Sequence, residues 1–112
     1  MIEQIILEYL KDKLDTDDVY TETPQEPPSV FVRIEKTGGN RNAYLKRATV
    51  AVQSYGSSLH EAASLNEIVI EAMLGIDELD SISKCELNSD YNFTDTQQKK
   101  YRYQAVFNLT YY

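Results

Sequence analysis

The chain has 112 residues and a mass of 12.9 kDa, which suits one domain with a single hydrophobic core and excludes the large enzyme barrels. Its 42% hydrophobic and 26% charged residues are typical of an ordinary globular domain. Eighteen acidic against eleven basic side chains give a formal net charge of -7, which opposes sequence-independent binding to nucleic acid.

The chain offers few residues for redox or metal chemistry. Cys85 is its single cysteine and cannot form an internal disulfide, and with His60, the single histidine, it cannot complete a tetrahedral zinc site. We therefore expect no metal and no cofactor. The N-terminal stretch has no basic leader and no run of about 18 apolar residues occurs, so we expect folding in the cytoplasm and no membrane partner. The sequons at Asn92 and Asn108 are interpreted as chance matches.

The N-terminal residues predict an amphipathic helix from Ile2 to about Leu14. Its apolar residues recur at helical spacing, at Ile2, Ile5, Ile6, Tyr9, Leu10 and Leu14. Residues 15–29 are acidic and contain three prolines, which excludes a second helix there. We interpret them as a long surface connector with a short extended piece at Val19 and Tyr20.

From Val30 the hydrophobic period changes to two, which predicts a strand with one buried face. We expect Gly38-Gly39-Asn40 to end this strand. Alternation resumes at Ala48 and continues to Tyr55, so the two runs predict a hairpin with a long polar tip. In the first run, Val30, Val32 and Ile34 are expected to share one face; in the second run, one face is expected to hold Ala48, Val50, Val52 and Ser54.

A second helix is predicted to begin at Ser58. Ser58 and Glu61 have the spacing of a capping box, in which both side chains bind free backbone donors at a helix start. Gly75 suits the helix end. The expected apolar stripe consists of Ala62, Leu65, Val69, Ala72, Met73 and Ile76. Small residues at Ala62 and Ala63 would let this helix lie close to a sheet.

Two further extended runs complete the pattern, at Ile82–Ser89 and Tyr101–Tyr111, with a polar, turn-rich segment between them. The order α-β-β-α-β-β predicts one α+β domain over residues 1–112. We expect a mostly antiparallel sheet of four strands, or slightly more, with two helices packed on one face.

Two groups of carboxylates are candidates for cation binding or acid-base chemistry. The block Asp15–Asp18 with Glu26 resembles a calcium loop, but Val19 stands where an oxygen ligand is required, and an acidic connector is the better interpretation. The loop Asp77–Asp80 could hold magnesium or supply an acid and a base, although acidic loops often serve only solubility.

His60 and Cys85 form the remaining candidate pair for catalysis. His60 falls in the first turn of the second predicted helix, where the helix dipole disfavours its charged form. Cys85 falls in a strand pattern that is typical of a small packed residue rather than an activated thiolate. We therefore predict no enzyme activity.

Charge alternates in blocks along the chain. Residues 1–30 carry eight acidic and two basic side chains, and residues 51–95 carry nine acidic and one basic. The basic blocks contain Arg33, Lys36, Arg41, Lys46 and Arg47 in the first hairpin and Lys99, Lys100 and Arg102 at the last strand. A subunit with one basic end and one acidic side can dock head to tail on copies of itself and close a ring. Accidental clustering on a solvated surface is the alternative.

The nine tyrosines favour buried contacts with a partner, because their rings are apolar and their hydroxyl groups remain polar. Packing on the chain's own sheet accounts for at least half of them.

Several segments together resemble the small tail-terminator or neck proteins of long-tailed bacteriophages and prophages. They are V-Y-T-E-T-P at 19–24, P-P-S-V-F-V-R-I-E at 27–35, T-G-G-N-R at 37–41, A-T-V-A-V-Q-S-Y-G at 48–56, S-S-L-H-E-A-A-S-L-N-E-I-V at 57–69 and Y-R-Y-Q-A-V-F-N-L-T-Y at 101–111. The resemblance extends over nearly the whole chain, as loose patterns rather than a catalytic signature.

This resemblance implies an α+β subunit that forms a ring, commonly a hexamer, on the head-proximal end of a completed tail tube. Such a ring stops tube polymerisation and provides the head-joining surface of the virion, and it is assembled in the bacterial cytoplasm. The implied partners are copies of the chain, the tube protein and neck or connector proteins, while DNA passes through without specific binding. The T-G-G-N-R segment corresponds to a contact loop. The expected interface residues are Gly38, Gly39, Arg41, Lys46, Arg47, Lys99, Lys100 and Arg102.

Two other functions remain open at this point. One is a head-completion or connector adaptor of the neck. The other is a small acidic enzyme or ligand-binding domain that uses His60, Cys85, Asp77 or Asp80.

Overall fold

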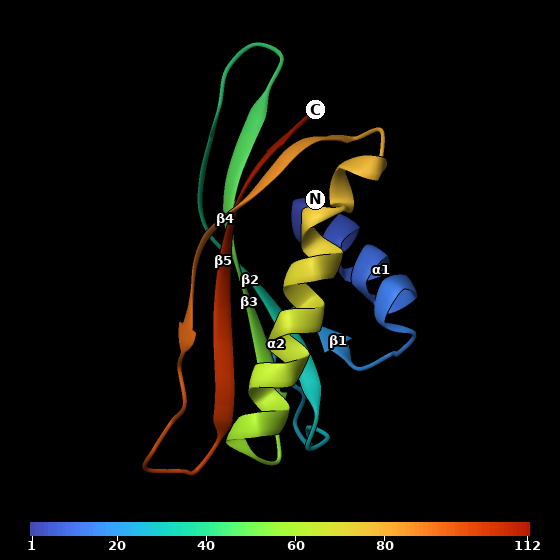
Figure 1. Cartoon of the computed structure of the whole chain (residues 1–112). Coiled ribbons are helices and arrows are strands. Elements are labelled where there is room, and N and C mark those ends of the chain that lie inside the picture. Colours follow the sequence, from blue (N-terminus) through green and yellow to red (C-terminus); the bar gives the residue numbers. More distant parts are fainter.

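The computed structural model describes all 112 residues, and Figure 1 shows their arrangement. The elements in chain order are α1 (Ile2–Leu14), β1 (Val19–Tyr20), β2 (Phe31–Arg41), β3 (Lys46–Gly56), α2 (Leu59–Leu74), the short 3-10 helix η1 (Ile76–Glu78), β4 (Ile82–Asn92) and β5 (Tyr101–Tyr111). The predicted bounds of the first helix and of the last strand are confirmed.

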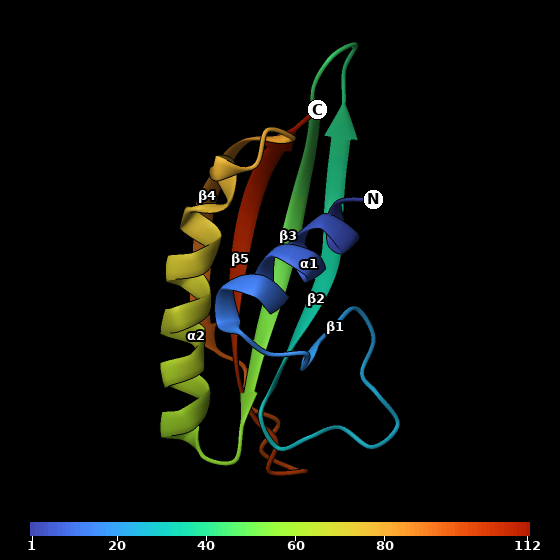
Figure 2. The ribbon, with the colours of Figure 1, turned by 90° about the vertical axis from the view of Figure 1, so that its right-hand side faces the viewer.

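The five strands form one sheet in the order β1-β2-β3-β5-β4. β1 pairs with β2 in parallel over two residues, and every other neighbouring pair is antiparallel. Both helices lie on the same face of this sheet (Figures 1 and 2). The predicted α+β fold with two helices on one face is therefore confirmed, with a short parallel strand added at one edge.

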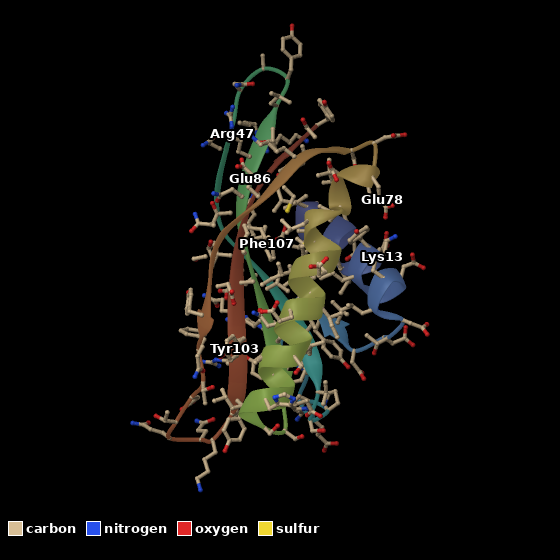
Figure 3. The ribbon with its side chains drawn as sticks, in the orientation of Figure 1. Lys13, Arg47, Glu78, Glu86, Tyr103 and Phe107 are labelled. Atoms are coloured by element: carbon tan, nitrogen blue, oxygen red, sulfur yellow. The ribbon has the colours of Figure 1, made fainter.

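The core lies between the sheet and the helices, because alternate strand residues point toward α1 and α2. Phe107 of β5 is fully buried there, and Figure 3 shows its side chain directed toward α2. The buried cluster consists of Ile2, Ile6, Tyr9, Leu10, Val19, Val32, Ile34, Ala48, Val50, Val52, Val69, Met73, Ile76, Ile82, Ala105, Phe107 and Leu109. Val30, which was expected to share this face, lies outside β2 and is exposed.

The start of α2 has the predicted cap, with one change. The Ser58 hydroxyl accepts a hydrogen bond from the Glu61 backbone N–H at 3.1 Å. The Glu61 carboxylate accepts from the backbone N–H and the hydroxyl of Ser57, at 2.7 and 2.6 Å, rather than from Ser58. These two bonds lower the pKa of Glu61. A Cβ atom on Gly56 would lie 2.6 Å from the Ala62 nitrogen, so this close approach of helix and sheet requires glycine.

The prediction that Gly38-Gly39-Asn40 ends the first strand is wrong. β2 continues to Arg41 and pairs with β3 throughout, with a bulge between Lys36 and Gly38. Neither glycine has a positive φ, so both are compatible with extended backbone. The turn itself spans residues 42–45, and the Asn42 N–H donates to the Leu45 carbonyl at 2.9 Å. The hairpin is therefore a long ribbon rather than two strands with a long loop.

Candidate assembly surfaces

The β2–β3 hairpin extends past the helices and forms one end of the molecule (Figures 1 and 2). The Asn42 side-chain oxygen accepts from the Leu45 N–H at 3.2 Å, which closes the turn locally. Tyr44 follows at the tip and is 87% exposed. Arg41 and Arg47 are exposed, and neither forms an ion pair within the chain. The tip thus presents one tyrosine ring between free positive charges.

The segment between β4 and β5 forms the opposite end of the molecule (Figure 1). The Asp95 carboxylate accepts from the backbone N–H groups of Gln97 and Gln98, at 3.1 and 3.2 Å, which holds the turn. Lys99 takes a left-handed backbone conformation with φ of 54°, and Lys99 and Lys100 are both exposed. This end therefore also presents two exposed lysines.

A cleft of about 310 Å³ lies beside this turn. The turn lines one wall, and the proline-containing connector lines another through Pro27 and Pro28. Tyr55 also lines it, and its ring stacks on Phe31 with 4.2 Å between ring centres. The cleft therefore combines aromatic surface with the positive charges of Lys99 and Lys100 and the carboxylate of Asp95.

Arg102 has a different role from the two lysines beside it. Its guanidinium group lies 4.6 Å from the centre of the Phe93 ring and 5.8 Å from that of Tyr55. It also donates to the Phe93 carbonyl at 2.7 Å and to the Tyr55 hydroxyl at 3.3 Å. Arg102 thus fixes the wall of the cleft, and its charge is engaged within the chain.

The eight predicted interface residues do not form one surface. Five of them, Gly38, Gly39, Arg41, Lys46 and Arg47, belong to the hairpin end, and Lys99, Lys100 and Arg102 belong to the cleft end. β3 runs between the two ends, since Lys46 pairs with Tyr111 and Gly56 with Tyr101. Eleven residues of extended strand span about 33 Å, and the molecule measures 44 × 25 × 25 Å. The predicted basic residues therefore lie at two ends of the subunit rather than at the single end that we predicted.

The helices and the start of the connector after α1 form an acidic layer between these ends. Exposed carboxylates in this layer include Glu8, Asp12, Asp15, Asp17, Glu67 and Glu71. Lys13 pairs with Glu78 at 2.8 Å and ties α1 to η1, as Figure 3 shows, and this contact raises the pKa of Lys13. The charge pattern is therefore basic, acidic, basic along the long axis.

A ladder of polar side chains crosses the sheet face that carries no helix. Arg33 donates to the Gln53 side-chain oxygen at 3.2 Å, and Gln53 donates to Gln104 at 2.8 Å. Gln104 in turn donates to the Tyr91 hydroxyl. Gln53 is only 4% exposed although no helix covers it. This ladder was not predicted, because its only signal in the sequence is polar residues at alternate strand positions.

A second buried polar contact joins α2 to β4. Asn66 is buried within the apolar stripe of α2 and donates to the Asp90 carboxylate at 2.6 Å. The predicted stripe did not include Asn66, because an asparagine breaks the hydrophobic pattern. This contact fixes β4, an edge strand, against the helix layer.

The candidate catalytic residues do not meet. His60 lies in the first turn of α2 near the cleft end, whereas Cys85 pairs with Leu109 toward the hairpin end. Burial, with smaller effects of Asp77 and Glu86, raises the pKa of the Cys85 thiol to about 12, which opposes a thiolate. Asp77 and Asp80 are exposed, and no three potential ligands gather for a metal ion. Neither helix is long and apolar enough to cross a membrane.

Comparisons with known proteins give similarity in fold only. No family model matches the chain, and no curated protein matches it in sequence. Among solved structures, a chain in the virion of a native gene transfer agent (GTA) particle superimposes with a TM-score of 0.72 at 11% sequence identity. The superposition covers 98% of this chain and 93% of that chain. At this identity the similarity establishes a shared fold.

Proposed function

We propose that the protein is a structural component of a phage-like virion and forms a ring on the head-proximal end of the tail. The ring ends polymerisation of the tail tube and provides the surface that joins the head. The observation that carries this proposal is the similarity in fold to the chain of the gene transfer agent virion, which extends over nearly all of both chains. The resemblance of the sequence to tail terminators supports the position in the tail.

The positions of the charged residues support an orientation in which the long axis of each subunit is parallel to the ring axis. With its long axis along the ring axis, each subunit directs one basic end to the tail tube and the other to the neck. Arg41, Lys46 and Arg47 then belong to one ring face and Lys99 and Lys100 to the other, where Arg102 supports the cleft wall. Gly38 and Gly39 lie further from the hairpin tip, as a contact between subunits. Opposite charges on the partner rings would steer association and fix its direction.

The ring acts by assembly and not by catalysis. The separation of His60 from Cys85 and the raised pKa of the thiol support this part of the proposal. The net charge of -7 is compatible with DNA that passes through the ring without binding to it. Copies of the chain, the tube protein and connector proteins are its partners.

Deletion of the gene in a phage or prophage that produces the protein tests the proposal. We expect electron microscopy to show tails of uncontrolled length and heads without tails, and the wild-type gene supplied in trans should restore both. Tails of normal length joined to heads in the deletion strain would overturn it.

The protein partner separates a tail terminator from an adaptor of the neck. Affinity purification of the tagged chain from a producing strain should recover the tail tube protein in amounts close to those of the chain itself. Recovery of the portal protein in place of the tube protein would assign the chain to the neck.

A further inference from the structure

The sheet has two free edges on opposite sides of the subunit. β4 pairs only with β5, so its outer backbone groups have no strand partner. At the other side, β1 covers β2 only at Val32 and Arg33, and the outer edge of β2 is free from Ile34 to Arg41. Figure 2 shows the two edges flanking the sheet. An unpaired edge is a ready template for a strand of another chain.

The two free edges lie at the same level along the strands. Gly38 pairs with Thr49, Thr49 with Asn108, and Asn108 with Glu86. Through the same four strands, Asn40 lies level with Lys84. Copies in a closed ring are related by rotation without a shift along the axis. Edges at equal height satisfy this condition with no offset between neighbours.

Strand direction is also compatible with pairing between copies. The direction reverses from β2 to β3, from β3 to β5 and from β5 to β4, so β4 runs opposite to β2. A second copy placed beside the first in the same orientation would bring its β2 antiparallel to β4. The alternation of the sheet then continues unbroken from one subunit to the next.

The composition of the two edges favours this contact. A Cβ atom on Gly38 would meet nothing within 4 Å, so the chain's own packing does not require glycine there. At Gly39 a Cβ atom would lie 2.6 Å from the Arg47 carbonyl oxygen, so packing within the chain accounts for that glycine but not for Gly38. Gly38 leaves the backbone of β2 without a covering side chain, unlike the charged or proline residues that protect an edge. Between its two bulges β4 is regular over residues 84–87, level with the glycines. The free part of β2 carries Glu35, Lys36 and Arg41, and β4 carries Lys84, Glu86 and Asp90, which gives the edges opposite net charge.

From these observations we infer that β4 of one copy pairs antiparallel with β2 of the next, with Glu86 opposite Gly38. The sheets of neighbouring copies thereby form one continuous sheet around the ring. This inference rests on the ring of the proposed function and names the surface that closes it.

Paired cysteines test the register directly. We would introduce Gly38→Cys and Glu86→Cys into a chain with Cys85→Ser, because opposite residues of antiparallel strands have Cα atoms about 4.5–5.5 Å apart, within the range of a disulfide. After mild oxidation, a gel without reductant should show most of the chain in a ladder of linked copies that ends at the ring size. Each single-cysteine variant should give no species larger than a dimer.

A second pair on the same face serves as the matched control. Glu35 lies level with Ser89, and the bulge in β4 leaves Glu86 two ladder positions away, so Glu35→Cys with Glu86→Cys places the Cα atoms about 7–8 Å apart, beyond the range of an unstrained disulfide. Linking of this pair as efficient as that of Gly38 with Glu86 would overturn the inferred register.

Linking of the cysteine pair is measured in two samples, isolated tails and the purified chain. The two results together distinguish failure of this inference from failure of the proposed function. Rings without a Gly38–Glu86 link would overturn the edge contact and leave the proposed function intact. Linked rings from the purified chain, with none of the chain in the tails, would support the edge contact and contradict the tail function. A chain that stays monomeric and unlinked at every concentration and in isolated tails overturns the edge contact.

Discussion

The helix-covered half of the β2–β3 ribbon differs from the half that forms the hairpin end, although the same two strands build both. Under the helices, Val32, Ile34, Val50 and Val52 are almost fully buried. Beyond Ile34, every residue of β2 is exposed. Backbone pairing continues across the boundary while side-chain burial on β2 stops. Because burial supplies most of the stability of a domain, the covered half determines whether the chain folds, and the extension is free to serve assembly.

Val69→Asp should give the largest loss of stability. Val69 is fully buried in α2 against the sheet, and an unpaired carboxylate there cannot recover its hydration. We expect a loss of at least about 4 kcal/mol in the free energy of unfolding, measured by urea denaturation followed by circular dichroism.

The adjacent residue provides the control for this substitution. Ile68 is 55% exposed on the same helix, so Ile68→Asp should change the free energy of unfolding by no more than about 0.5 kcal/mol. Equal losses from the two substitutions would contradict the assignment of the buried face of α2.

Glycine to alanine substitutions test the same difference between the covered half and the extension through the space around the backbone. At Gly56, a Cβ atom would lie 2.6 Å from the Ala62 nitrogen, so Gly56→Ala must push α2 from the sheet at a cost of about 1–3 kcal/mol. At Gly38 the same atom meets open space, and Gly38→Ala should leave stability unchanged or raise it slightly. Denaturation of both variants checks this difference, and a loss at Gly38 as large as that at Gly56 would contradict it.

The burial of Cys85 should make the free energy of unfolding depend on pH. Burial raises its pKa from 9.0 to about 12, so the thiol stays neutral in the folded chain at pH values where the unfolded chain ionises. This contribution to stability is complete below about pH 9 and is lost as the pH rises toward 12. At pH 10 we expect a loss of at most about 1 kcal/mol, since part of the group is exposed to solvent.

Cys85→Ala separates this loss from the titration of other groups. The variant should show a smaller decrease in the free energy of unfolding between pH 8.5 and pH 10 than the parent, under otherwise identical conditions. Parallel pH profiles would show that Cys85 is not protected in the folded chain.

The local patterns of the sequence were sufficient for most of the elements. The helical spacing of Ile2, Ile6 and Leu10 and the alternation in Tyr101–Tyr111 each predicted an element with the bounds observed, because each pattern reflects burial on one side. The two glycines in β2 led us to predict a strand end that does not exist. Their extended conformation depends on pairing with Ala48 and Thr49, a contact that no local pattern reveals.

The arrangement of the candidate surfaces could not be predicted, because it depends on which strands are neighbours. The insertion of β5 between β3 and β4 joins Gln53 to Gln104 and places Lys99 far from Arg47. Charge blocks along the chain identified the basic residues correctly. These residues lie at two different ends because of the directions of the strands that carry them, and composition contains no information on strand direction.

Reversal of charge at the hairpin end should have a small effect on stability and a large effect on assembly. We expect the triple variant Arg41→Glu, Lys46→Glu and Arg47→Glu to unfold within about 1 kcal/mol of the parent, because exposed charges contribute little to folding. Of the three, only Lys46 has an aromatic contact, at 5.8 Å from the centre of the Tyr111 ring. Analytical ultracentrifugation and binding to isolated tail tubes should show a loss of association, strongest at low salt.

The matched variant reverses charge at the other end, with Lys99→Glu and Lys100→Glu. Both variants should fold, since all five side chains lie outside the buried cluster. If the two ends belong to opposite faces of a ring, the hairpin variant and the cleft variant should each lose a different partner, the tail tube in one case and the neck in the other. If both variants lose the same partner, the two ends act together. If both variants associate fully at low salt, neither basic end takes part in assembly.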